Sequence, residues 1–353
     1  MLQFQPAMGL WRCPGGGAGF RLGPFRAEPK HLSCVGVLSE IAVPIAGGSA
    51  SRIGQHVTNC HTFCENNPDK FIYQIRGNFA GMMVVADGKM RKINTKQDPM
   101  FRPLAYASWH PGGRHIAATI NMFHPFWPAG GERQDFEAVE KRGDLVVYDV
   151  EKNTINTSSQ VFGNEYIETH PCWSADGRYI YSKLGTSCSF PRPSKCGRYV
   201  LHILADQTTY PIHQNSSDLY MLDLQTMKDT RLDEACSERS ESYPRWSSNG
   251  RWFSFVSNRR DGISALPYFA YFDGQGKTHK AFVLPQEDPA WYDTFTDTYN
   301  AVELVKSKVR IREDEIARGM QQDAVDAKFP NPPAVEAPAD STQKQAPASG
   351  SHY

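Results

Sequence analysis

The chain has 353 residues, with 38 basic and 38 acidic side chains, and its formal net charge at pH 7 is zero. This balance offers no basic surface for nucleic acid or an anionic membrane, and no run of about 18 apolar residues predicts a membrane-spanning segment. Aromatic residues make up 12% of the chain, which suits a β-rich core, and the length allows one large β domain with tails.

The N-terminal segment, residues 1–57, shows no regular pattern, and glycines and arginines interrupt its apolar stretches. A secretory signal needs a continuous apolar core of about 7 to 15 residues, so no export signal is visible. The sequence predicts an irregular segment here. Two locations stay open: the cytoplasm, or export of a protein whose natural start differs from the one given.

The sequence NCHTFC, Asn59 to Cys64, opens the first regular unit. Covalent c-type haem needs two thiols and an adjacent histidine in the order CxxCH, but Val57 stands where the first thiol belongs. Cys60 and His61 therefore leave a haem with one thioether bond as one interpretation. A metal ion held by Cys60, His61 and Cys64 is a second. The favoured interpretation is an ordered loop with a buried thiol pair or a local disulfide.

One pattern recurs from Ser108, Pro171, Pro191 and Tyr243 onward: an apolar approach, a tight turn with glycine, a basic residue and then alternating β-formers. Glycine supplies the positive φ that a short hairpin turn requires. Further predicted strands follow three of these hairpins, at 144–149, 218–223 and 268–273. Repeated units of four antiparallel strands are typical of β-propeller blades.

The third unit is too short for a blade. About 20 positions separate Trp173 from Pro193, whereas four strands of about 5 residues with their turns need twice that number. Either this blade is truncated, which leaves an edge open to pairing, or the ring closes with one blade fewer.

The C-terminal region changes character after the fifth unit. Residues 303–328 predict a short, weakly amphipathic helix. Residues 329–353 are rich in Pro, Ala and Ser and predict a disordered tail. Residues 58–302 between the two ends form the predicted propeller domain.

These units, W/S-x-x-G-R-x-I followed by D-L-x-x-x-D, resemble the blades of the TolB-like, WD-repeat-like bacterial propellers over about Asn59 to Tyr299. The resemblance implies a six-bladed propeller outside the cytoplasm that binds or scaffolds other proteins. We therefore expect an all-β propeller of five to six four-stranded blades, one of them incomplete, and a periplasmic or cell-envelope location.

A binding surface is predicted where the loops between second and third strands meet the connections into the next blade. In antiparallel blades these segments emerge at the same end, and aromatic and arginine side chains there suit a protein or peptide partner. The predicted binding residues are Phe123, His124, Phe126, Trp127, His170, Tyr210, His213, Tyr243, Arg259 and Arg260. The alternative for each residue is packing within its own loop.

The recurring tryptophans Trp109, Trp173 and Trp246 are interpreted as packing between blades. The arginines that follow each turn, such as Arg114 and Arg198, are interpreted as partners at hairpin ends rather than an anion site.

No GxSxG, HExxH, Walker A or GxGxxG sequence is present, so the chain is predicted not to be an enzyme. Three functions stay open: a binding or scaffolding propeller without a cofactor, which is favoured, a haem-dependent electron-transfer protein using Cys60 and His61, and a propeller that binds a carbohydrate or small ligand at 122–127.

Overall fold

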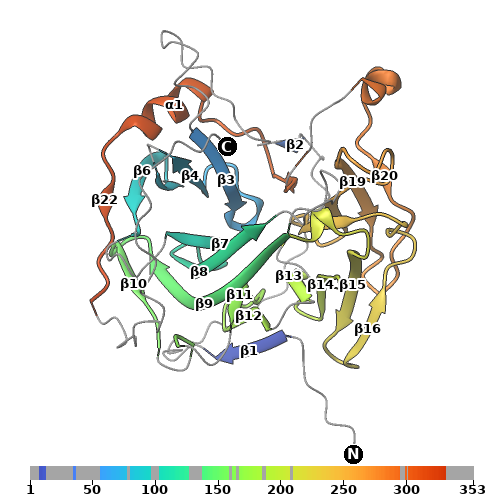
Figure 1. Cartoon of the computed structure of the whole chain (residues 1–353), viewed down its shortest axis with the longest axis horizontal. Helices are drawn as coiled ribbons and strands as arrows, with labels where there is room; N and C mark the ends of the chain where they lie inside the picture. The colour runs from blue at the N-terminus through green and yellow to red at the C-terminus, as the bar shows by residue number, and fades with distance from the viewer. Residues whose placement is uncertain are drawn as a thin grey trace, which may run out of the picture.

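The computed structural model describes residues 8–12, 35–36, 56–77, 80–96, 103–126, 137–158, 161–163, 167–184, 188–206, 210–294, 299 and 301–330. Its sheets are arranged around a central axis as the blades of a propeller (Figure 1). The predicted all-β propeller, with one incomplete blade, is therefore confirmed.

Four blades have four antiparallel strands each, and the innermost strand comes first in the chain. Their strands are β3 (His56–Phe63), β4 (Phe71–Gly77), β5 (Gly81–Ala86) and β6 (Lys89–Asn94); β7 (Leu104–Trp109), β8 (His115–Phe126), β9 (Glu137–Asp149) and β10 (Thr154–Asn156); β13 (Cys188–Pro193), β14 (Tyr199–Leu204), β15 (Asp218–Asp223) and β16 (Lys228–Arg231); and β17 (Glu241–Trp246), β18 (Trp252–Ser257), β19 (Leu266–Tyr271) and β20 (Phe282–Val283).

The third unit contributes only two consecutive strands, β11 (Glu168–Trp173) and β12 (Tyr179–Leu184). Its outer edge is paired: β1 (Met8–Arg12) runs antiparallel to β12, from Met8 opposite Lys183 to Arg12 opposite Tyr179. Figure 1 shows β1 lying along the outer side of this unit. The predicted truncation is thus present, and a strand from the N-terminal segment covers the edge it leaves.

The blades pack face to face, and the core lies between them. One large cluster of buried side chains joins the first two blades, with Ile72, Val84, Ile116 and Val146 among its members. A second cluster joins the blades that begin with β13 and β17.

The tryptophans that precede the turns pack between blades, as predicted. Trp109 and Trp173 are each 6% exposed. The indole Nε1 of Trp109 donates to the Thr62 carbonyl at 3.2 Å, and that of Trp246 donates to the Arg192 carbonyl at 2.9 Å. Each of these bonds ties a blade to the innermost strand of the blade before it.

The arginines after the turns are hairpin-end partners, as predicted. Arg114 donates to Asp149 at 2.9 Å, and Arg198 donates to Asp223 at 2.7 Å, in both cases from the second strand to the end of the third.

Every innermost strand contains a β-bulge near its middle, where the register with the second strand shifts. In four of them the first bulge residue has a positive φ of 50° to 54°: Tyr106, His170, Phe190 and Tyr243. A positive φ is unfavourable for bulky residues and persists where the surrounding fold imposes it. Its recurrence in four blades indicates that the bulges set which side chains face the axis.

The ring closes between the β17 blade and the first blade through a returning segment. There β21 (Glu303–Leu304) pairs with β2 (Val35–Gly36), and Asn66 Nδ2 donates to the carbonyls of Trp246 at 3.0 Å and Leu304 at 2.5 Å. After it, α1 (Glu313–Gln321) buries Ile316 and Met320 against the first blade. Finally β22 (Val325–Asp326) runs parallel to β6 (Figure 1). Within residues 303–328, where a short helix was predicted, only Glu313–Gln321 is helical, and strands lie at both ends of the range. The predicted disordered tail lies outside the described residues from 331 onward.

Candidate functional site

A polar cavity of about 130 Å³ lies on the propeller axis, at the end where the first and second strands of each unit are joined. Successive innermost strands place equivalent residues around it. They are Thr62 and Phe63, Ser108 and Trp109, Cys172 and Trp173, Arg192 and Pro193, and Arg245 and Trp246. Turn residues, among them Ser174, Lys195 and Ser248, form its mouth.

Two arginines and one glutamate dominate the charge inside the cavity. Arg192 on β13 and Arg245 on β17 occupy the same position of the repeat, and Glu303 on β21 faces them. Arg245 Nε lies 3.2 Å from Glu303 Oε1, while Glu303 Oε2 accepts a hydrogen bond from the Phe63 amide at 3.2 Å. Glu303 therefore joins the first blade to the last at the centre of the ring.

Arg192, unlike Arg245, has no ion-pair partner among the described residues. It is 9% exposed; its Nη1 donates to the Pro191 carbonyl at 3.0 Å, and its Nε has no partner among the described residues. Burial, together with the neighbouring charge of Arg245, lowers the pKa of Arg192 to about 10. The guanidinium is still charged at pH 7, but it is poorly compensated.

One further ion pair lies at the mouth, between Lys195 and the partly exposed Glu65. His61 lies near Glu303 and Arg245, and burial lowers its pKa, so its imidazole is neutral at pH 7. The charged residues that line the cavity are thus three cationic and two anionic, which leaves one positive charge in excess.

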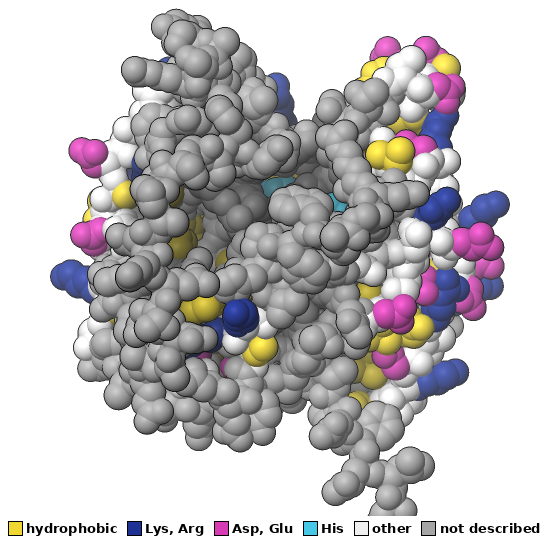
Figure 2. All heavy atoms as spheres, viewed as in Figure 1, with side chains coloured by type: hydrophobic (Ala, Val, Ile, Leu, Met, Phe, Trp, Pro, Cys, Tyr) yellow, Lys and Arg dark blue, Asp and Glu magenta, His cyan; other side chains and the backbone are white. Residues whose placement is uncertain are grey.

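An aromatic layer lies two residues earlier along the same strands. His170 is 4.1 Å from both Tyr106 and Phe190 between ring centroids, and Phe190 is 5.0 Å from Tyr243. These rings come from four successive units and meet at the axis because the bulges turn them inward. Figure 2 shows a hollow near the centre of the face it views, in which histidine side chains are visible.

The structure distributes the predicted binding residues over several places. His170 and Tyr243 belong to the aromatic layer. Tyr210 and His213 lie at the short 3₁₀ helix Pro211–His213, where burial lowers the pKa of His213. None of the predicted residues whose side chains the structure describes lines the cavity, and their role in binding stays a prediction.

Arg259 and Arg260 have intramolecular partners. Arg259 Nη2 lies 2.9 Å from Glu241, which is fully buried, and the guanidinium stacks 4.4 Å from the Tyr268 ring centroid. Arg260 pairs with Asp293. The partners of Arg259 thus lie on β17 and β19 rather than in its own loop, and its role in binding stays a prediction.

The remaining predicted residues are only partly described. The backbones of Phe123, His124 and Phe126 lie on β8, but their side chains and the whole of Trp127 fall outside the described residues. The same holds for the side chain of Cys60.

His61 and Cys64 face different neighbours. Cys64 Sγ lies 3.7 Å from the His110 carbonyl, and burial raises the pKa of its thiol to about 11. The haem and metal interpretations stay predictions.

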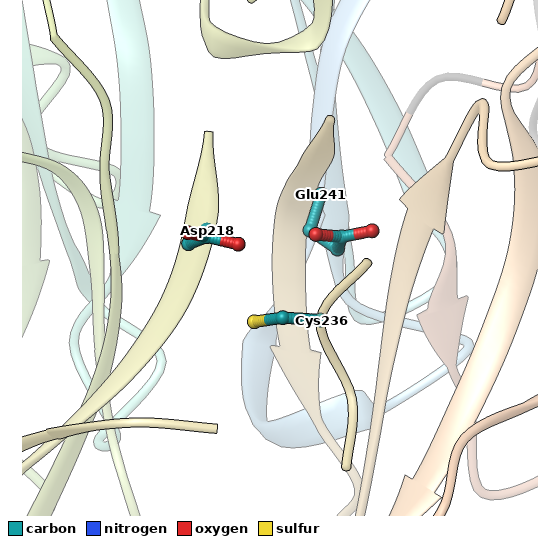
Figure 3. A group of neighbouring side chains, drawn as sticks. All are labelled: Asp218, Cys236 and Glu241. Atoms are coloured by element: carbon teal, nitrogen blue, oxygen red, sulfur yellow. The ribbon is translucent and has the colours of Figure 1, made fainter. Parts of the chain in front are cut away.

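Asp218, Cys236 and Glu241 form a cluster whose potential ligand atoms lie within 4.8 Å of one another (Figure 3). Both carboxylates already have arginine partners, since Arg231 pairs with Asp218 at 2.8 Å and Arg259 with Glu241. Burial also raises the pKa of the Cys236 thiol to about 12, whereas a metal ion requires a thiolate. The cluster is therefore explained as part of the fold.

Sequence reasoning missed Arg192, Arg245 and Glu303. The signal for the arginines was present, because the dipeptide Pro-Arg precedes the turn in two units where other units have Ser108 and Cys172. Glu303 had no such signal, since it belongs to no repeat.

No protein-family model matches the chain, and no curated protein matches it. Solved structures that it resembles include TolB from Acinetobacter baumannii, at 14% identity and a TM-score of 0.39, covering 65% of this chain and 57% of TolB. The Dos1 propeller is 12% identical with a TM-score of 0.37, covering 66% of this chain and 65% of that one. The chain spans less than two thirds of either protein, and the likeness concerns the fold alone.

The prediction that the chain is not an enzyme, made from the absence of catalytic sequence motifs, was wrong, because solved structures that the chain resembles include enzymes. Similar structures include puromycin hydrolase, 13% identical with a TM-score of 0.36 over 67% of this chain and 37% of that one. They also include oligogalacturonate lyase, 12% identical with a TM-score of 0.33 over 60% of this chain and 61% of that one. These likenesses assign no reaction to this chain.

Proposed function

We propose that the protein is a binding module that receives one side chain or chain end of a protein or peptide partner in its central cavity. The observation that carries the proposal is the cavity itself. It is lined by polar and charged side chains from every unit, and its mouth is formed by the turns that join first and second strands.

The size of the cavity supports a partner larger than its bound group. Pockets that enclose whole drug-sized ligands measure about 300–1,000 Å³, whereas this one measures about 130 Å³. It has room for a single functional group. The rest of the partner would lie across the turns that form the mouth of the cavity.

This proposal places the partner at the opposite end of the blades from the surface predicted from sequence. The two surfaces can be told apart by substitution. Ser248 is exposed and lines the mouth, so Ser248→Trp would obstruct the cavity without disturbing the core. Gln225 is exposed in the β15–β16 turn at the same end of the blades but does not line the cavity, so Gln225→Trp is a matched control.

The experiment is selection of binding peptides from a random library displayed with free C-termini, with the full chain as target. We expect selected peptides to bind the wild type and Gln225→Trp equally and Ser248→Trp at least about 10-fold more weakly. Peptides that bind all three proteins equally would place the contact elsewhere. An unproductive selection would contradict peptide binding.

A location outside the cytoplasm is also proposed, on the resemblance to TolB-like propellers alone. No helix in the described part of the chain has the length and apolarity to span a bilayer. Fractionation of the source cells with an antibody to the chain tests the location, and recovery with cytoplasmic markers would contradict it.

A further inference from the structure

Arg192 and Arg245 bring two guanidinium groups from adjacent blades into the same cavity. Their strands, β13 and β17, follow one another around the ring, and both residues sit directly after the bulge. The equivalent positions of the other three units hold Thr62, Ser108 and Cys172, which are uncharged. The charge is therefore concentrated on one side of the cavity.

Glu303 cannot balance both arginines. Its single negative charge faces two positive charges: Oε1 lies 3.2 Å from Arg245 Nε without a hydrogen bond, and Oε2 accepts from the Phe63 amide. Glu303 attracts Arg192 but forms no ion pair with it among the described residues. Arg192 donates to the Pro191 carbonyl and has a side-chain hydrogen bond with Cys172, but its Nε has no partner among the described residues, although a guanidinium carries five N–H donors. A buried donor without a partner is destabilising, and a buried charge more so.

Carboxylate is the anionic group that matches this site. Guanidinium presents two parallel N–H donors that fit the two oxygens of a carboxylate, and such charge-assisted pairs are strong when they are shielded from water. A carboxylate is also the anion that every peptide carries, at its C-terminus or on an Asp or Glu side chain. It is small enough for a cavity of about 130 Å³.

We infer that Arg192, supported by Arg245, binds a carboxylate of the partner that enters the central cavity. This inference rests on the proposed function, since it names the group that the cavity receives. The other charged groups that face the site are Glu303 and the Lys195–Glu65 pair at the mouth, and the neutral His61 adds no competing charge.

The first test uses the wild-type protein, so it does not depend on whether a variant folds. A selected peptide is synthesised with a free or amidated C-terminus, and with each Glu or Asp replaced by Gln or Asn, and the Kd is measured by fluorescence anisotropy. We expect one of these neutralisations to weaken binding about 10- to 100-fold, which identifies the source of the carboxylate. Equal affinity of all neutralised peptides would overturn the inference.

The second test assigns the carboxylate to Arg192. Arg192→Gln should lose about 10- to 100-fold in affinity for the carboxylate peptide and bind the neutralised peptide as the wild type does. Arg251→Gln is the charge-matched control, because Arg251 is exposed after the β17–β18 turn and does not line the cavity. A loss of affinity for both peptides alike would contradict direct recognition.

The two proposals fail in different ways. If Ser248→Trp blocks binding but neutralisation has no effect, the cavity is the site and the carboxylate inference is wrong. If neutralisation weakens binding but Ser248→Trp does not, an anion is recognised outside the cavity and both proposals are wrong. A thermal melt of each variant separates these outcomes from unfolding.

Discussion

Arg245 and Glu303 face each other across the seam where the propeller ring closes, with Arg245 Nε 3.2 Å from Glu303 Oε1. Both side chains are largely buried, at 14% and 4% exposure. The same contact thus links the closure of the ring to the charge of the central cavity, and substitutions there should affect both.

Glu303→Gln is expected to lower the free energy of unfolding by about 3 kcal/mol, because it leaves Arg245 buried beside Arg192 without a carboxylate. Urea denaturation measures this loss. The same variant should bind a carboxylate peptide more tightly than the wild type, because a competing anion has been removed. Glu287→Gln, at an exposed position, is the control. A change within about 0.5 kcal/mol of that control would contradict the account.

Trp246→Phe and Trp173→Phe should lower the free energy of unfolding by different amounts, although the two residues are equivalent in the repeat. Trp246 Nε1 donates to the Arg192 carbonyl, whereas Trp173 Nε1 has no partner among the described residues. Both variants lose apolar contact, but only Trp246→Phe also loses a hydrogen bond. Its loss of unfolding free energy should therefore exceed that of Trp173→Phe by about 1 kcal/mol. Equal losses in chemical denaturation would show that the bond contributes nothing.

Arg259→Met should destabilise the protein by about 3 kcal/mol, because it leaves the buried carboxylate of Glu241 uncompensated. The neighbouring Arg260→Met should cost less than about 1 kcal/mol, since Arg260 and Asp293 are both exposed. Thermal and urea denaturation of the pair test this. If Arg259→Met is stable and instead loses partner binding, Arg259 belongs to the surface predicted from sequence.

Stability should decline as the pH rises from about 6.5 to about 9, because of His202. Its Nε2 lies 3.0 Å from Asp229 Oδ1 and its Nδ1 lies 3.5 Å from Cys188 Sγ. Burial lowers the pKa of His202, but the hydrogen bonds with Asp229 and Cys188 outweigh it and raise the pKa to about 9. In the unfolded chain the pKa of a histidine is about 6.5. The stabilisation from protonated His202 is therefore complete below that pH and is lost as the pH passes 9.

Asp229→Asn should remove most of this pH dependence, which we expect to amount to about 2 kcal/mol, given the partial exposure of Asp229. Denaturation curves at pH 6, 7.5 and 9.5 for both proteins measure it. An equally steep decline in the variant would assign the effect to other groups.

The parts of the fold that were predictable from the sequence are those written into the repeat. The turn glycines, the tryptophans at 109, 173 and 246, and arginines such as Arg198 recur at fixed spacing, so local chemistry predicts their roles. The short third unit was visible from spacing alone.

The unpredicted parts depend on contacts distant in sequence. β1 pairs with β12 across about 170 residues, and Glu303 meets Phe63 across 240. A short strand such as β1 can pair with an open sheet edge without a strong β-forming pattern in its own sequence. Arg192 and Arg245 were not singled out, because the Pro-Arg dipeptide alone does not reveal the bulge that turns this part of the strand toward the axis.

Site-specific photocrosslinking tests the central claim, that the partner occupies the cavity end of the propeller, most directly. A photoreactive amino acid is placed at Ser248 at the mouth, at Gln225 on the outer part of the same end, or at the exposed Ile263 on the β18–β19 loop of the opposite end. The account predicts that a selected peptide is crosslinked from position 248 and not from 225 or 263. Crosslinking from 263 in preference to 248 would contradict it and favour the long-loop surface.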